Sequence, residues 1–277
     1  MLKQRILTAF VLLALLLPAL LVSPAWPFAL LTLVAMAAAG WEWARLNDGG
    51  RWSVALGVGL GIACLLAFLA GWTTSAPRLA WWAAMAIWVL GGAWVLRGGV
   101  AGWPRVPRSL RLGLGLVALW TAWLAMLNAK AGGLNFILSI FVLVWTADVF
   151  AYFGGRAFGR RKLAPAISPG KSWAGVWSGM AGAVVLAVAW VAFDGSGLAY
   201  NDSFFTLVNE RFTAIGLVLV VVFLVAMSVV GDLFESLVKR SAGAKDSSGL
   251  LPGHGGILDR VDALLPVFPI ALALAPL

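Results

Sequence analysis

Charged residues are scarce in this 277-residue chain, where Asp, Glu, Lys and Arg together make up only 11%. Soluble globular domains carry about 25% charged residues, more than twice this fraction. Hydrophobic residues make up 62% of the chain. The net charge of +9 comes from short connectors between apolar runs, without a basic tail or a lysine-rich segment interleaved with aromatics. The composition therefore predicts a membrane protein and argues against nucleic acid as a partner.

Cysteine and histidine each occur once. The single Cys64 excludes an intrachain disulfide, and its place in an apolar run indicates a small buried side chain. The sequence holds no zinc motif, no pair of haem ligands and no serine hydrolase elbow. It also has no convincing internal repeat, which weakens the hypothesis of a transporter built from inverted repeats.

Apolar runs of about 20 residues recur along the chain, and each is long enough to cross roughly 30 Å of hydrocarbon. A membrane β-barrel would instead show alternating segments of about ten residues, and none occur. The first run is too long for a cleaved signal peptide, so we interpret it as a membrane helix. The predicted fold class is all-α, a polytopic integral membrane helical bundle of about nine spans, near 5–22, 26–44, 53–72, 79–96, 110–129, 134–153, 173–193, 212–231 and 262–276.

The basic residues predict the orientation of these spans. With a cytoplasmic N-terminus, all but three of the 20 Lys and Arg residues fall in cytoplasmic connectors, as the positive-inside rule requires. The opposite side receives Arg78, Lys130 and Arg211. We expect an integral protein of a bacterial inner (plasma) membrane whose polar site faces the cytoplasm.

Residues 228–262 concentrate charge of both signs in this apolar chain. On a helix, Asp232, Ser236 and Lys239 share one face, and a loop rich in Gly, Ser and Pro separates them from further acids. Carboxylates from two segments are common Mg²⁺ ligands, and the cations between them can hold phosphates. The alternative is a charged re-entrant loop tied by internal ion pairs. The charged residues are Asp232, Glu235, Lys239, Arg240, Lys245, Asp246, Asp259, Arg260 and Asp262.

Two upstream features can complete such a site. Asp148 lies near the end of the sixth predicted span, where a carboxylate usually faces a cavity, although structural pairing with Arg156 is the alternative. The segment S-P-G-K-S at 168–172 offers hydroxyls, free amides and the ammonium of Lys171 at an expected helix start, which suits a phosphate. The basic run 160–162 is interpreted as topogenic charge. His254, between glycines, fits a structural hydrogen bond and a ligand contact equally well.

These motifs resemble those of the phosphatidate cytidylyltransferase (CDP-diacylglycerol synthase) family. The family signature S-x-x-K-R, K-D, P-x-H-G-G and D-R-x-D is matched in that order between Ser236 and Asp262. The upstream pattern A-D-x-x-A-Y-F-x-G-R-x-F-G begins at Ala147, and I-S-P-x-K ends at Lys171. The resemblance covers roughly 145–265. It departs at Ala174, where the family usually has a glutamate, so the role of that glutamate cannot be transferred.

The resemblance implies that CTP and phosphatidate react to CDP-diacylglycerol and pyrophosphate, with Mg²⁺ as cofactor. It implies membrane helices at 1–133 and a catalytic membrane region at 134–277, and it is compatible with a homodimer. The expected catalytic residues are Asp232, Asp259, Lys239, Arg240, Lys245, Arg260 and His254. The expected substrate-binding residues are Asp148, Ser168, Lys171, Ser236, Asp246 and Asp262, and the expected metal ligands are Asp232, Asp259 and Asp246.

Two other classes of protein stay open at this point. A transporter or ion channel would also place Asp148 and Asp232 at membrane depth, but it predicts no dependence on CTP. A CDP-alcohol phosphotransferase would need D-G-x-x-A-R followed by spaced glycines and aspartates, and this pattern is absent.

Overall fold

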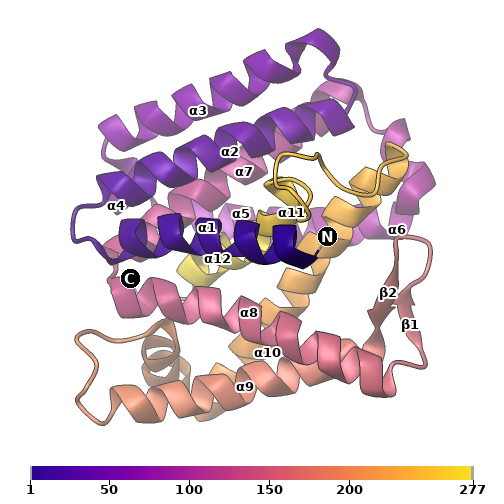
Figure 1. The fold of residues 1–277 in the computed structure, drawn as a ribbon. Helices are drawn as coiled ribbons and strands as arrows, with labels where there is room; N and C mark the ends of the chain where they lie inside the picture. The colour runs from indigo at the N-terminus through magenta and orange to yellow at the C-terminus, as the bar shows by residue number, and fades with distance from the viewer. Residues whose placement is uncertain (1, 276–277) are drawn as a thin grey trace.

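The computed structural model describes residues 2–275, with the side chains of 2–6 and 9 excepted, as an almost entirely helical chain (Figure 1). Seven helical segments are long and apolar enough to cross a membrane, and α1 adds a shorter apolar stretch, Phe10–Leu21. The helices are α1 (Leu2–Leu21), α2 (Trp26–Leu46), η1 (Gly50–Trp52), α3 (Ser53–Leu69), α4 (Trp72–Ser75), α5 (Arg78–Ala86), η2 (Ile87–Gly91), α6 (Gly92–Gly102), η3 (Trp103–Arg105), α7 (Arg108–Ala131), α8 (Leu134–Phe158), α9 (Trp173–Asp194), α10 (Phe204–Ser241), α11 (Leu258–Val261) and α12 (Leu264–Leu274). The predicted all-α membrane class is confirmed.

Within residues 2–275, seven or eight helical segments are able to span a membrane rather than nine, because the predicted ninth span at 262–276 has a different structure. Its helix α12 has 11 residues, which corresponds to about 16 Å of length, and residue 276 lies outside the described residues. All its residues from Leu264 to Ala273 are buried, and it packs against α5, α7 and α10. An apolar helix surrounded by protein has the same composition as one surrounded by lipid, so the sequence pattern alone did not separate the two.

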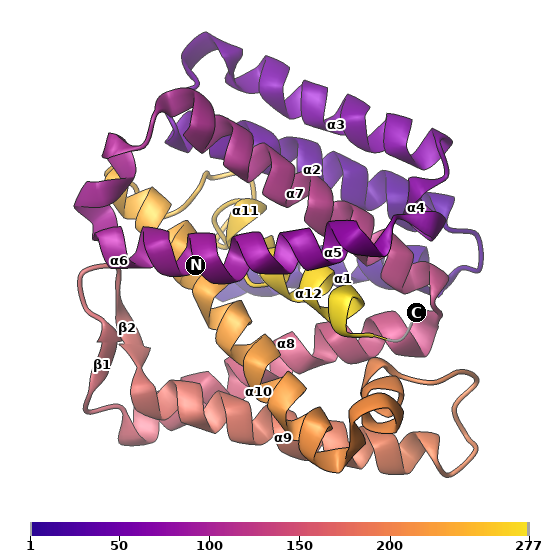
Figure 2. The same ribbon diagram turned by 180° about the vertical axis from the view of Figure 1, so that it is seen from behind.

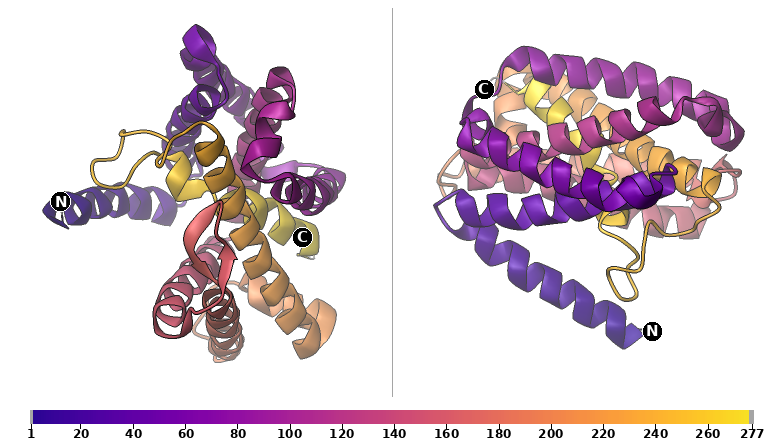
Figure 3. Two further views of the ribbon diagram at one scale, coloured as in Figure 1. Left: turned by 90° about the vertical axis from the view of Figure 1, so that its right-hand side faces the viewer. Right: turned by 90° about the horizontal axis from the view of Figure 1, so that it is seen from above.

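The long helix α10 and the short α12 lie at the centre of the bundle, and the other helices radiate from them (Figure 3). Seen from behind, α10 runs obliquely across α8 and α9 (Figure 2). The 38 residues of α10 are interrupted at Thr213, which has a positive φ of 65°. At the C-terminal end of α12, the carbonyl of Ala275 accepts hydrogen bonds of 3.4 Å from Arg78 and Arg211. The C-terminal half of α10 lies beside α11 and the start of α12, where Gly231 faces the carbonyl of Asp262 and the ring of Pro266.

Small residues allow α8 and α9 to approach closely. A Cβ built on Gly175 or Gly179 would lie 2.8 Å from the backbone carbonyl of Ala151 or Ala147 on α8, which is too close for any side chain. Gly57 on α3 likewise faces the carbonyl of Ala37 on α2. The absence of side chains at these glycines lets the paired helices pack against each other.

A short antiparallel hairpin, β1 (Lys162–Ala164) and β2 (Ser168–Ser172), connects α8 to α9. The helix begins at Trp173, as the predicted span 173–193 does, but Lys171, expected at the helix start, lies just before it on β2. Ser172 is its N-cap, and its hydroxyl accepts a 3.2 Å hydrogen bond from the amide of Gly175. The strand directs Lys171 toward α10 rather than along α9.

Candidate active site

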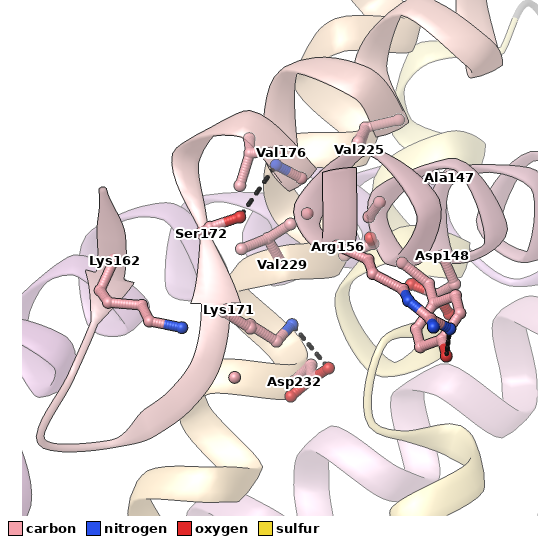
Figure 4. Close-up of a pocket in the computed structure, with 16 residues that line it drawn as sticks. Ala147, Asp148, Arg156, Lys162, Lys171, Ser172, Val176, Val225, Val229 and Asp232 are labelled. Atoms are coloured by element: carbon pink, nitrogen blue, oxygen red, sulfur yellow. Dashed lines mark hydrogen bonds and ion pairs between the residues drawn. The ribbon is translucent and has the colours of Figure 1, made fainter. Parts of the chain in front are cut away.

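A cavity of about 570 Å³ lies between α8, β2, the start of α9 and the middle of α10. Its polar lining combines two carboxylates with three cations (Figure 4). The apolar part of the wall comes from α8, α9 and α10. The charged lining residues are Asp148, Arg156, Lys162, Lys171 and Asp232.

Two of the predicted site residues, Lys171 and Asp232, meet in this cavity as an ion pair. The Nζ of Lys171 lies 2.6 Å from Oδ2 of Asp232, and both side chains are partly exposed to the cavity. One turn further along α10, the hydroxyl of Ser236 donates a 3.3 Å hydrogen bond to Oδ1 of Asp232. The structure therefore brings together Asp148, the S-P-G-K-S segment and the charged stretch of α10, which are far apart in sequence.

A second ionic cluster lies next to this cavity and is buried. Lys239 Nζ is 2.5 Å from Oε2 of Glu235 and 2.5 Å from Oδ1 of Asp259. The other oxygen of Asp259 accepts hydrogen bonds from the amide and hydroxyl of Ser247, at 3.0 and 2.9 Å, and from the amide of Gly256 at 2.7 Å. Burial raises the pKa of Asp259, but the bonds from Lys239 and the amides outweigh it and hold that pKa at about 2. Asp259 is thus ionised and joins the loop 247–258, which follows α10 in the chain, to Lys239 of that helix.

The other predicted site residues do not line the cavity. Arg240 donates to the carbonyls of Ile167 and Ala244, at 3.4 and 3.1 Å, and so joins the hairpin to the end of α10. His254 sits in a turn closed by a 2.8 Å bond from its amide to the carbonyl of Leu251, and its Nδ1 is buried without a hydrogen-bond partner among the described residues. The predicted residues outside the lining are Ser168, Ser236, Lys239, Arg240, Lys245, Asp246, His254, Asp259, Arg260 and Asp262.

Two cations that the sequence interpretation assigned elsewhere belong to the cavity. Lys162, interpreted as topogenic, lies on β1 and lines it. Arg156 also lines it and donates a 3.5 Å hydrogen bond to the hydroxyl of Tyr152. No ion pair joins Arg156 to Asp148 within the described part of the chain, so the alternative of a structural pair finds no support there.

The sequence interpretation missed Glu42, which lies near the end of α2 and has an exposed fraction of 0%. Its Oε1 accepts from the hydroxyl of Ser248 at 2.5 Å and the amide of Ile257 at 3.0 Å. Its Oε2 accepts from the amide of Leu258 at 2.7 Å, and it lies 3.2 Å from the hydroxyl of Ser247, whose single proton is shared between Glu42 and Asp259. The available signal was a single acid near the end of an otherwise apolar span.

Gly256 lies in the loop that binds Glu42, at a position where the packing leaves no room for a side chain. A Cβ at this position would collide with the hydroxyl of Ser247 and with Oε1 of Glu42. We expect Gly256→Ala to destabilise the protein by about 1–3 kcal/mol, the usual cost of overpacking, in denaturation measurements in detergent. Gly249→Ala in the same loop is the matched control, because a Cβ there meets nothing within 4 Å. Equal effects of the two substitutions would show that Gly256 is not packed tightly against Ser247 and Glu42.

The carboxylates fit a metal that binds together with phosphate. Within residues 2–275, no three His, Cys, Asp or Glu side chains form a group that could hold a metal by themselves. Mg²⁺, however, is usually held by one or two carboxylates together with phosphate oxygens and water. Asp148 and Asp232 supply two carboxylates to one cavity, beside three cations suited to phosphate. Fold and site together define a polytopic membrane protein built to act on phosphate-bearing substrates.

Comparison with known proteins identifies the family. Residues 3–277 match the Cytidylyltransferase family, so the match extends well beyond the motif region at 145–265. A phosphatidate cytidylyltransferase of Pseudomonas aeruginosa is 40% identical over 289 residues, which cover 99% of this chain and 97% of the relative. The chain belongs to the cytidylyltransferase family and is similar over nearly its full length to this phosphatidate cytidylyltransferase.

Two further relatives match over about half of this chain. A phosphatidate cytidylyltransferase of Haemophilus influenzae is 51% identical over 137 residues, which are 50% of this chain and 44% of the relative. One of Bacillus subtilis is 39% identical over 142 residues, which are 51% of this chain and 48% of the relative. In both, the match spans less than half of the relative's own length.

Proposed function

We propose that the protein transfers the cytidylyl group of CTP to phosphatidate and releases pyrophosphate and CDP-diacylglycerol. The observation that carries this proposal is the cavity in which Lys171, Asp232, Asp148, Arg156 and Lys162 converge, in a chain that matches the family throughout. Neither a transporter nor a channel requires three cations beside two carboxylates in one pocket. A nucleotidyl transfer uses both, cations to bind the phosphates and carboxylates to hold Mg²⁺.

The reaction needs charge neutralisation more than it needs a base. A phosphate oxygen of phosphatidate, already anionic near neutral pH, forms a bond to the α-phosphorus of CTP, and the bond from that phosphorus to the pyrophosphate oxygen breaks. Lys171, Lys162 and Arg156 line the cavity where they can bind the anionic groups of both substrates. Their fixed positions reduce the repulsion between the reactants and align them for in-line transfer.

We also propose that Mg²⁺ takes part in the reaction. Mg²⁺ would be held by Asp232 and Asp148 with phosphate oxygens, and when bound it would polarise the α-phosphate and neutralise the leaving pyrophosphate. The ion pair with Lys171 holds the carboxylate of Asp232 in the cavity. Metal binding by Asp259 and Asp246 stays a prediction; both oxygens of Asp259 already accept hydrogen bonds from the protein.

The membrane setting supports a lateral route for the lipid. Tyr152 of α8 lines the cavity and packs edge-on against Phe153, and the two side chains have exposed fractions of 62% and 64%. We propose that phosphatidate enters from the bilayer and CTP from the cytoplasm, in a bacterial inner membrane whose orientation follows from the positive-inside bias. A homodimer stays a prediction, to be measured by mass determination in detergent.

The test is an assay of the purified protein in detergent with phosphatidate, CTP and Mg²⁺. We expect pyrophosphate and CDP-diacylglycerol in equal amounts, with no release when phosphatidate is omitted. Chelation of the metal should stop the reaction, and Mg²⁺ should restore it. Folded protein that binds phosphatidate yet forms neither product would overturn the proposal and favour the transporter hypothesis.

A further inference from the structure

We infer that Glu42 is a positioning residue that holds the loop 247–258 in place for the nucleotide; this inference rests on the proposed function. Glu42 lies on α2, more than 200 positions before the loop in sequence, and its carboxylate contacts four donors on that loop. None of these donors is charged. A fully buried carboxylate without a cation is tolerated only where hydrogen bonds replace the lost water.

The two ends of the loop converge on this one carboxylate. The hydroxyls of Ser247 and Ser248 bind it from the start of the loop, and the amides of Ile257 and Leu258 bind it from the end. The loop between them is therefore clamped at its base. The clamped segment carries His254 at its turn, with Asp246 and Lys245 immediately before it.

The hydrogen bonds around Glu42 continue to α10 through a chain of polar contacts. The hydroxyl of Ser247 lies within hydrogen-bond distance of both Glu42, at 3.2 Å, and Asp259, at 2.9 Å. Asp259 in turn holds Lys239, which pairs with Glu235. Glu235 lies three residues after Asp232 on the same helix. Through this chain, Glu42 links the loop to α10, the helix that carries Asp232. We assign its effect to CTP rather than to the lipid, because the loop lies outside the candidate membrane spans and is flanked by the cations Lys245 and Arg260.

The decisive variant is Glu42→Gln. Glutamine keeps one acceptor oxygen but turns an NH₂ donor toward groups that are themselves donors, so the base of the loop loses part of its clamp. We expect KM for CTP to rise about tenfold or more, because small displacements of binding groups are costly. KM for phosphatidate should stay unchanged. Trypsin should also cleave after the exposed Lys245 faster than in the wild type.

Two further variants separate positioning from general loss of stability. Thr32→Val, on the same helix, removes a buried hydroxyl that accepts a 3.0 Å bond from Trp123, far from the loop. It should lower stability without changing KM for CTP or cleavage after Lys245. Ser248→Ala removes one donor to Glu42, and its effect on KM for CTP should be non-additive with that of Glu42→Gln, since both act on one contact.

Each outcome decides the inference. An unchanged KM for CTP in Glu42→Gln, or additive effects with Ser248→Ala, would overturn it. If the wild type has no cytidylyltransferase activity, the proposed function fails, but cleavage after Lys245 still reports whether Glu42 holds the loop. Equal cleavage of wild type and Glu42→Gln would show that it does not.

Discussion

Asp232→Asn is expected to lower the rate of pyrophosphate release by about 10³-fold, the range in which single charged groups contribute to phosphoryl transfer. The asparagine has nearly the same shape and can still accept the hydrogen bond from Ser236, so the helix should fold as before. The variant loses the charge that pairs with Lys171 at 2.6 Å and one carboxylate of the proposed metal site. The measurement is the initial rate with saturating CTP and phosphatidate, compared with the wild type.

Asp202→Asn is the matched control for this substitution. Asp202 is an exposed acid in the segment before α10, outside the residues that line the cavity. Its replacement should leave the rate unchanged, and both variants should show wild-type thermal unfolding. Full activity in Asp232→Asn would remove Asp232 from the reaction and with it the proposed metal site.

The membrane fold was predictable because its main signal is local. Apolar runs of about 20 residues define the long helices, and their existence needs no knowledge of what packs around them. The same signal failed for α12, whose 11 residues are surrounded by α5, α7 and α10 rather than by lipid. The hairpin β1–β2 was missed because its strands have only three and five residues, too short for a periodic pattern to appear.

The candidate site was predictable as a set of residues but not as a set of contacts. Charge is so rare in this chain that Asp148, Lys171 and Asp232 stand out without any structure. Which of them pair depends on the path of the connectors. Lys239 shares a helix face with Asp232, yet its partners are Glu235 and Asp259. Glu42 could not be linked to the loop 247–258 from sequence, since only the packed bundle brings α2 beside α11.

Lys239→Met should be the most destabilising single substitution among the charged residues of α10. Lys239 is the one cation between two acids, and the side chains of Lys239, Glu235 and Asp259 are only 11%, 1% and 5% exposed. Methionine fills similar space but leaves both carboxylates buried without their partner. Removing one member of a buried ionic cluster typically costs about 3–5 kcal/mol, which thermal unfolding in detergent without ligands should register as a large drop in the midpoint.

A second substitution tests whether this cost comes from the unpaired charges. Lys239→Met combined with Glu235→Gln should recover part of the lost stability, because one of the two uncompensated acids is then neutral. Arg108→Met, which removes an exposed cation at the start of α7, should leave the unfolding midpoint unchanged. If the double variant is no more stable than Lys239→Met alone, then the lysine contributes through its packing rather than its charge. In that case Asp259 would keep its place through the amides of Ser247 and Gly256, and the loop would not depend on α10 for its position.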